Sequence, residues 1–227
     1  MSARPAARVY GAATPSLDRI VTVALAIIDD HGVEGLSMRR LAVALDSYPA
    51  NLYRRFTHLD ELLGLVAVRI IDEAGGTPSP DLAPEASLLD FALRIRAGWL
   101  RHPRATPLLF AEGSDPLAAV MEAVLTCFES MAVDPVAAVQ AAYEFVIVLF
   151  GAIFAGASTA IKHAQADARL PDAAKFPATA RANAVLAELS GAPPHDQAAA
   201  TLPQFERAIR NVLGRAAHPS ASSPRRR

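Results

Sequence analysis

One short stretch constrains the fold more than any other. Residues 37–56, SMRRLAVALDSYPANLYRRF, have the pattern of two short helices joined by a tight turn. Leu41 and Leu45 recur at helical spacing, and Ser37 precedes them where its hydroxyl caps a helix N-terminus. An Asp, which tolerates the left-handed region, follows the last apolar residue, and Pro49 has the fixed φ that suits the start of a second helix. The pattern predicts a helix-turn-helix.

The second helix of this pair, residues 49–56, divides its side chains between two faces. Leu52 and Phe56 are four residues apart, so they pack together on the inner face. The outward positions carry an amide, phenols and guanidiniums, which are groups that contact base edges and phosphates in duplex DNA. The alternative is an ordinary solvated helix face. The predicted DNA-binding residues of the helix pair are Ser37, Arg39, Arg40, Tyr48, Ala50, Asn51, Tyr53, Arg54 and Arg55.

These residues differ in their expected roles. Asn51 and Arg54 are expected to contact bases, since an amide pairs with adenine and a guanidinium with guanine. The local charge supports DNA binding: residues 37–58 hold four Arg and one Asp, whereas the whole chain of 227 residues has a formal net charge of −1. The residues expected to hold phosphates are Ser37, Arg39, Tyr53 and Arg55.

Breaks in the helical pattern divide the chain into two domains. Residues 17–74 are predicted to form the helix-turn-helix domain, and a Gly- and Pro-rich segment at 75–80 marks the boundary. Residues 85–217 are predicted to form a second domain. The flanking segments, 1–16 and 218–227, are predicted to be a flexible arm and a disordered tail.

Capping residues locate the first and last helices of the first domain. Ser16 is a predicted cap for an opening helix that ends at Gly32. Thr57 with Asp60 three residues on has the pattern of a capping box, which predicts a last helix that extends to Ala74.

No alternating strand pattern follows the boundary, so the fold class is predicted to be all-α. Asp134-Pro135 combines a capping Asp with Pro at the first helical position. The helices expected in the second domain are 85–102, 116–131, 135–161, 176–189 and 202–216, with a short helical turn at 105–110.

The segment from Leu17 to about Ala74 resembles the N-terminal DNA-binding domain of the TetR family of transcriptional repressors. It differs from the family pattern at Asp46, Ser47 and Tyr48, where the family usually has Gly, an apolar residue and Ser. The resemblance implies a repressor that binds a palindromic operator in double-stranded DNA as a homodimer. It is carried by Arg19, Ile20, Ala24, Leu25 and Ile28, then by Leu36-Ser37-Met38-Arg39-Arg40-Leu41-Ala42, and finally by Pro49-Ala50-Asn51-Leu52-Tyr53-Arg54-Arg55-Phe56.

Residues 145–161 carry no charge over 17 positions, which is the lower limit for a membrane-spanning helix. The alternative is a helix that its own subunit and a partner bury on all sides. We favour the second, because no basic cluster or interfacial Trp flanks the segment. In the TetR family two late helices of each subunit form a four-helix dimer interface, and the resemblance implies that role for 135–161 and 202–216.

The second domain is most similar to the C-terminal domain of tetracycline repressors, through Trp99, His102-Pro103 and Phe205. This resemblance implies a cavity for a small-molecule inducer, which we expect to be largely apolar. Each residue near such a cavity is also an ordinary core residue when taken alone. The predicted ligand-binding residues are Trp99, His102, Phe110, Met121, Phe128, Tyr143, Phe150 and Phe154.

The sequence lacks the motifs of common enzymes, such as a phosphate-binding Gly loop, GxSxG, HExxH or a zinc-binding Cys pair. We therefore expect no enzyme activity, cofactor or metal site. Cys127 is interpreted as a small core residue, and a single thiol fits a reducing cytoplasm. Arg4 and Arg8 precede no apolar signal-peptide run, and they belong either to a solvated tail or to an arm in a minor groove. The alternative functions are a helical interaction protein of the same fold without DNA binding, and a helical enzyme.

Overall fold

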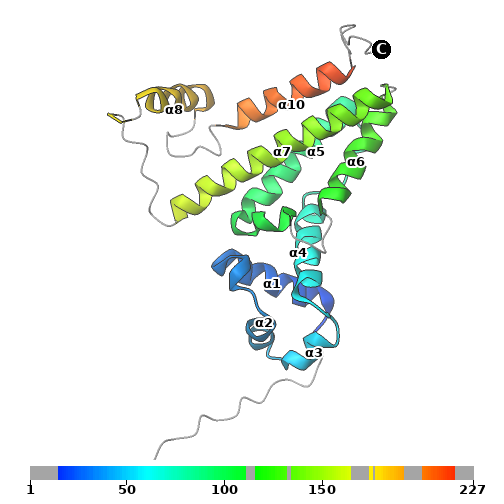
Figure 1. Cartoon of the computed structure of the whole chain (residues 1–227), viewed down its shortest axis with the longest axis vertical. Helices are drawn as coiled ribbons and strands as arrows, with labels where there is room; N and C mark the ends of the chain where they lie inside the picture. Colours follow the sequence, from blue (N-terminus) through cyan, green and yellow to red (C-terminus); the bar gives the residue numbers. More distant parts are fainter. Residues whose placement is uncertain are drawn as a thin grey trace, which may run out of the picture.

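The computed structural model describes residues 15–110, 116–131, 134–164, 174–175, 177–191 and 201–217. All regular elements within these ranges are helical, which confirms the predicted all-α fold (Figure 1). The predicted first domain contains α1 (Leu17–His31), η1 (Val33–Gly35), α2 (Met38–Ala44), α3 (Pro49–Tyr53) and α4 (Leu59–Glu73). The predicted second domain contains α5 (Pro84–Arg101), η2 (Pro103–Phe110), α6 (Pro116–Ser130), α7 (Pro135–Ala164), α8 (Pro177–Ser190) and α10 (Leu202–Ala217).

The helix-turn-helix forms through local capping bonds. The Ser16 hydroxyl accepts a hydrogen bond from the third residue of α1, and the Ser37 hydroxyl accepts one from Arg40 N–H at 3.2 Å. Asp46 has φ +49° in the turn, and Pro49 opens α3. Both predicted caps and the predicted turn are therefore confirmed. Leu52 and the apolar faces of α1, α2 and α4 fill the space between these helices.

The start of α4 differs from the prediction. The predicted capping box at Thr57 and Asp60 is wrong, because the helix begins at Leu59, one residue later than that pattern requires. His58 is the capping position and makes no side-chain capping bond. Instead the Glu61 carboxylate, at the third helical position, accepts a hydrogen bond from Thr57 N–H at 3.2 Å.

The first contact between the two domains lies where α4 ends and α5 passes beside it. Arg94 of α5 donates from Nη1 to the Ala74 carbonyl at 2.5 Å and from Nη2 to the Thr77 carbonyl at 3.1 Å. Gly98 allows the close approach, because a Cβ there would lie 2.9 Å from the Ala74 Cβ. The carbonyls at the C-terminal end of α4 are thus capped by a cation of the second domain.

The second contact between the domains joins η2 to the C-terminal end of α1. His102 Nδ1 lies 2.9 Å from Asp29 Oδ2 and 3.0 Å from Oδ1. Arg104 of η2 donates to the backbone carbonyl of Asp30. Both ends of the helix-turn-helix domain are therefore connected to the second domain, one through α4 and one through α1.

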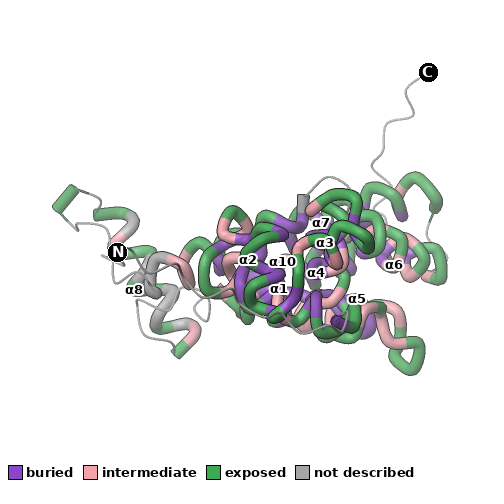
Figure 2. The backbone as a smooth tube through the Cα atoms, turned by 90° about the horizontal axis from the view of Figure 1, so that it is seen from below, coloured by how far each residue is buried: buried purple, intermediate pink, exposed green. Residues whose placement is uncertain are grey.

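The second domain is a helical bundle in which α7 packs against α5, α6 and α10 (Figure 1). Its interior is aromatic: Phe91, Trp99, Phe128 and Phe145 are fully buried, and the last two meet edge to face with ring centroids 6.3 Å apart. Figure 2 shows buried positions along the inward sides of the helices and exposed positions along their outer sides. Helix α7 is therefore the central helix of the bundle.

The helices agree with the predicted ranges within a few residues at each end. The largest differences are at α7, which continues to Ala164 rather than ending at residue 161, and at α3, which ends at Tyr53 rather than at residue 56. The predicted turn at 105–110 is a longer 3₁₀ helix that begins at Pro103. Most of the predicted N-terminal arm and all of the predicted tail lie outside the described residues.

One side of α7 is apolar and uncovered in the single chain. Ile147 is 68% exposed and Tyr143 is 57% exposed. A Cβ added at the exposed Gly151 would meet no atom within 4 Å. The exposed positions are spaced three, four and seven residues apart, so they lie on one side of the helix. We call Val136, Val139, Tyr143, Ile147, Gly151 and Phe154 the α7 stripe.

Candidate nucleic-acid interface

The predicted DNA-binding residues lie together around α2 and α3, at the end of the molecule opposite α10 (Figure 1). Tyr48 and Tyr53 are 50% and 60% exposed although both are aromatic. Asn51 is half-buried. The other members are exposed, namely Ser37, Arg39, Arg40, Ala50, Arg54 and Arg55. A row of guanidiniums, phenols and one amide thus faces solvent on a short helix pair, which suits a DNA groove better than a core.

Three side chains of this surface form a chain of hydrogen bonds. Ser47 is fully buried where α2 meets α3, and its hydroxyl accepts a hydrogen bond from Asn51 Nδ2 at 3.1 Å. Asn51 Oδ1 accepts a second bond from Arg54 Nη2 at 2.6 Å. Ser47 is not among the predicted DNA-binding residues. Its position four residues before Asn51, across a turn, is the only sequence signal for this contact.

Two of the arginines are bonded to the protein backbone. Arg40 Nη1 donates to the Gly35 carbonyl at 2.7 Å, and Arg55 Nη1 approaches the Pro15 carbonyl at 3.5 Å. Arg39 is exposed, and no bond of this kind holds it within the part of the chain that the structure describes. The surface therefore combines arginines that are bonded to the backbone with one, Arg39, that extends into solvent.

The predicted ligand-binding residues do not come together around one described cavity. Trp99, Phe128 and Phe150 are buried in the core, and Met121 packs against it. Tyr143 and Phe154 instead belong to the α7 stripe, and the side chain of Phe110 lies outside the described set. The cavity stays a prediction.

His102 has a different environment from the one expected for a ligand-binding residue. Its ring is mostly buried against Asp29 of the helix-turn-helix domain. Because a carboxylate only accepts hydrogen bonds, Nδ1 carries the proton. His102 is thus placed at the contact between the domains.

Trp99 offers a polar group in the interior of the second domain. Its indole Nε1 is buried and has no hydrogen-bond partner among the described residues. An unpaired buried donor is costly, by about 1–3 kcal/mol. An acceptor atom placed there would remove that cost.

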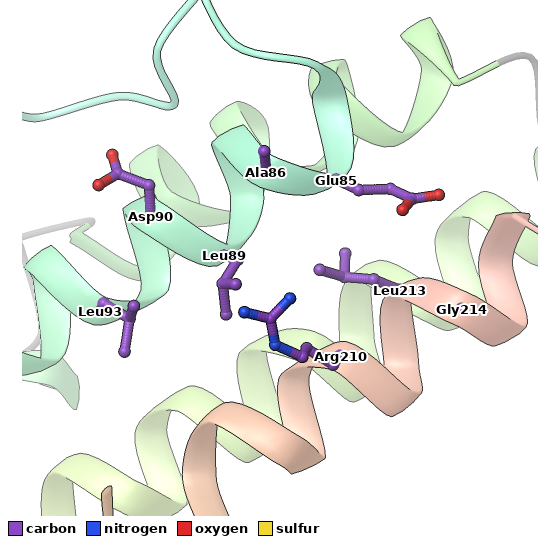
Figure 3. Close-up of a pocket in the computed structure, with 8 residues that line it drawn as sticks. All are labelled: Glu85, Ala86, Leu89, Asp90, Leu93, Arg210, Leu213 and Gly214. Carbon is purple, nitrogen blue, oxygen red and sulfur yellow. The ribbon is translucent and has the colours of Figure 1, made fainter. Parts of the chain in front are cut away.

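Two pockets are described, and neither is lined by the predicted ligand-binding residues. The larger, of about 460 Å³, lies between α5 and α10. Figure 3 shows Leu89, Leu93 and Leu213 there beside Glu85 and Arg210. The other, of about 360 Å³, lies beside α1 and α4. No group of three or more potential metal ligands occurs among the described residues.

Comparison with known proteins relates the chain to bacterial regulators. No protein-family model matches it. It is 35% identical over 131 residues to the HTH-type transcriptional repressor DrrR1 of Streptomyces coeruleorubidus, a match that covers 54% of this chain and 47% of that protein. The chain spans about half or less of the length of the curated relatives it matches.

Solved structures of bacterial regulators share the fold. The structure of Mycobacterium smegmatis BioQ has a TM-score of 0.67 at 24% identity and covers 89% of this chain and 98% of its own. BioQ with its double-stranded DNA operator has a TM-score of 0.55 at 29% identity, covering 63% and 88%. The TetR-family protein ActR of Streptomyces coelicolor in complex with (S)-DNPA has a TM-score of 0.61 at 22% identity, covering 89% and 98%.

An exposed helix-turn-helix carried on a larger helical domain is the architecture of many DNA-binding transcriptional regulators. The chain therefore has the fold of the TetR-family regulators among these structures.

Proposed function

We propose that the chain is a ligand-responsive repressor that binds a palindromic operator as a homodimer and is released by a small, largely apolar molecule. Residues 17–74 would bind DNA, and 85–217 would bind the ligand and form the dimer. The observation that carries the proposal is the exposed surface of α2 and α3, where Arg54 and Asn51 are held together beside Tyr53. Support from relatives comes from BioQ, whose structure is known with its operator.

The α7 stripe supports the homodimer. The 30-residue α7 is also long and apolar enough to cross a membrane. However, 44% of its most apolar 18-residue stretch is already buried inside the chain. The apolar residues of α10, such as Ile209 and Val212, pack inside the protomer. We therefore assign the apolar part of the interface to α7, with α10 at its polar edge, where Arg215 and Glu144 form an ion pair of 2.7 Å.

A dimer of this kind would contact DNA through two helix-turn-helix units at once. Two helix-turn-helix units related by a twofold axis contact half-sites about 34–36 Å apart on one face of the duplex. A change in their separation weakens both contacts together. This protein would act on DNA in the cytoplasm.

The ligand would bind in the second domain and act through its contacts with the first. The buried indole N–H of Trp99 supports a ligand that is largely apolar and carries one hydrogen-bond acceptor. The solved structures of ActR and of an Acinetobacter baumannii TetR variant include (S)-DNPA and minocycline, respectively. A tenfold loss of operator affinity requires about 1.4 kcal/mol of coupling between the two sites.

A direct test measures binding of the purified chain to the DNA beside its own coding region. We expect a shifted complex with one short segment and at least a thousandfold weaker binding to a scrambled duplex of equal length and composition, about the lower limit for specific regulators. Equal binding of both duplexes would favour the alternative, a helical interaction protein.

A second test measures ligand binding by the same purified chain. Trp99 is the only tryptophan of the chain, so its fluorescence reports binding in the second domain. A panel of apolar metabolites and antibiotics should contain compounds that change this fluorescence and weaken operator binding at matching concentrations. A compound that changes the fluorescence but leaves operator affinity unaltered would show a cavity that is not the switch.

A further inference from the structure

We propose that Ser47 and Asn51 are positioning residues that hold the Arg54 guanidinium for contact with a guanine of the operator. In this arrangement Arg54 reads the base, and Asn51 does not read an adenine itself. The inference deepens the proposed function and depends on it. It replaces the expectation that Asn51 and Arg54 each contact a base.

Ser47 anchors the arrangement. It is fully buried, and its backbone N–H donates to the Ala42 carbonyl of α2 at 2.9 Å. Its hydroxyl is therefore fixed relative to α2 while it accepts the hydrogen bond from Asn51 of α3 at 3.1 Å. A buried hydroxyl needs such a partner, because leaving it unpaired is costly. The amide of Asn51 is held by a group that does not move independently of the helix pair.

Asn51 has both ends of its amide engaged. Bidentate recognition of adenine requires the amide oxygen to accept from N6 and the amide nitrogen to donate to N7. In this structure Nδ2 donates to Ser47, and Oδ1 accepts from Arg54 at 2.6 Å. Asn51 is also half-buried, whereas Arg54 is exposed. One N–H and one lone pair of the amide stay available, but the two internal bonds already fix its orientation, so the exposed guanidinium is the better placed reader.

The bond to Asn51 directs Arg54 toward the end of α3 that meets DNA. Arg54 follows the last residue of α3 and is its C-terminal cap. Its Nη2 reaches back three residues to Asn51, along the direction that helical side chains favour. Recognition helices contact base edges with their N-terminal residues. The guanidinium thus lies nearer the reading end than its sequence position suggests.

The Arg54 guanidinium keeps enough N–H donors to bind a guanine. A guanidinium has five N–H groups, and one of those on Nη2 is used by Asn51. The remaining N–H groups suffice for two parallel bonds to O6 and N7 of guanine, which is the common specific contact of arginine. A side chain that is already held also loses less rotamer freedom on binding.

The experiment uses the full chain and an operator selected from a pool of randomised duplexes. Affinity is then measured for the selected duplex and for versions in which each G·C pair is replaced by A·T. For Arg54→Ala, the preference should fall about 5- to 100-fold at one G·C pair. For Asn51→Ala and Ser47→Ala, we expect a fall of about two- to tenfold at that same pair, the range of one ordinary hydrogen bond. Ser47→Thr keeps a hydroxyl and should retain the preference.

Two comparisons separate positioning from general stability. In an Arg54→Ala background, Asn51→Ala should have no further effect at that pair, because the bond between the two side chains is already lost. Tyr53→Phe, a neighbouring change on the same helix, should weaken binding to all duplexes alike and leave the preference at that pair intact. If Ser47→Ala fails to fold, as judged by circular dichroism, the Asn51→Ala variant decides the outcome alone.

Three results would overturn the inference. Asn51→Ala would show direct adenine reading if it altered the preference at an A·T pair instead. An unchanged preference at the Arg54 pair in Asn51→Ala would mean that Arg54 needs no positioning. A loss that is equal for all duplexes would show a structural role or a phosphate contact. Equal binding of all duplexes by the wild-type chain would overturn the proposed function itself, which is a different outcome.

Discussion

His102, the C-cap of α5, lies with its Nδ1 2.9 Å from the carboxylate of Asp29, and so connects the second domain to the C-terminal end of α1. Its side chain is 17% exposed, and that of Asp29 is 34% exposed. Ion pairs with this degree of exposure contribute about 1 kcal/mol or less to the free energy of folding. The contact is therefore strong enough to bias the position of α1 and weak enough to break when η2 moves.

Replacing Asp29 tests whether this pair holds the domains together. Asp29→Asn and His102→Ala should each speed amide hydrogen exchange at the end of α1 by up to about fivefold, because local opening loses the pair. The double variant should exchange no faster than either single variant. The control is Asp30→Asn, which removes the same charge from the next residue. Arg104 bonds the backbone carbonyl of Asp30 and not its side chain, so this variant should leave exchange at the end of α1 unchanged. Equal effects of Asp29→Asn and Asp30→Asn would contradict a specific pair.

Arg94 is predicted to hold the other contact between the domains. Arg94→Met keeps the length of the side chain but removes its bonds to Ala74 and Thr77, and should lower the free energy of unfolding by about 1–2 kcal/mol. Urea denaturation measures the loss. The control is Arg101→Met on the same helix, an exposed position where we expect a change below about 0.5 kcal/mol. A loss no larger than this in Arg94→Met would mean that the capping bonds contribute nothing.

The helix-turn-helix could be predicted because its signals act over a few residues. The Ser37 hydroxyl bonds the N–H three residues on, and Asp46 adopts the left-handed conformation in the adjoining turn. Leu52 is buried as the four-residue spacing to Phe56 requires. Each of these features depends on local geometry, which the sequence displays directly.

The contacts between distant segments could not be predicted in the same way. His102 and Asp29 are 73 positions apart, and no local pattern connects a residue after α5 with one near the end of α1. Tyr143 appears suited to a cavity by its chemistry, yet its side of α7 faces outward. The chemistry of a residue indicates what it can bind, whereas the direction of its side chain depends on how whole helices pack.

The α7 stripe yields a prediction about oligomeric state. Ile147→Arg should convert a dimer to monomers or aggregates, because a twofold interface would bury two unpaired charges at a cost of about 3–5 kcal/mol each. Val185→Arg introduces the same charge at an exposed valine of α8, outside the stripe, and should leave the dimer intact. Sedimentation velocity at micromolar concentration distinguishes these cases. A monomeric wild-type chain would exclude the interface.

Burial raises the pKa of the Cys127 thiol above its usual value, and a hydrogen bond with Ser130 lowers it by a smaller amount. The folded chain therefore keeps its proton at a pH where the unfolded chain loses it, so this group's contribution to stability falls as pH rises above about 8.5. Alkylation by iodoacetamide should reach its half-maximal rate at a higher pH in the native protein than in urea. The reverse order would contradict an inert core thiol. Cys127→Ala should remove this part of the pH dependence of stability.

Arg39 gives the sharpest test of the expected phosphate contacts. It is exposed at the second position of α2, and a contact with a phosphate carries no base information. Arg39→Ala should therefore weaken binding to the operator and to unrelated duplexes by the same factor. The slope of log affinity against log salt should become less steep by about one, because one fewer counterion is released when the complex forms. Glu34→Ala is the matched change at an exposed acidic residue of η1, and by removing a repulsive charge it should leave this slope unchanged or slightly steeper. An Arg39→Ala protein that loses affinity at one base pair only, with the salt slope of the wild type, would show that Arg39 reads sequence.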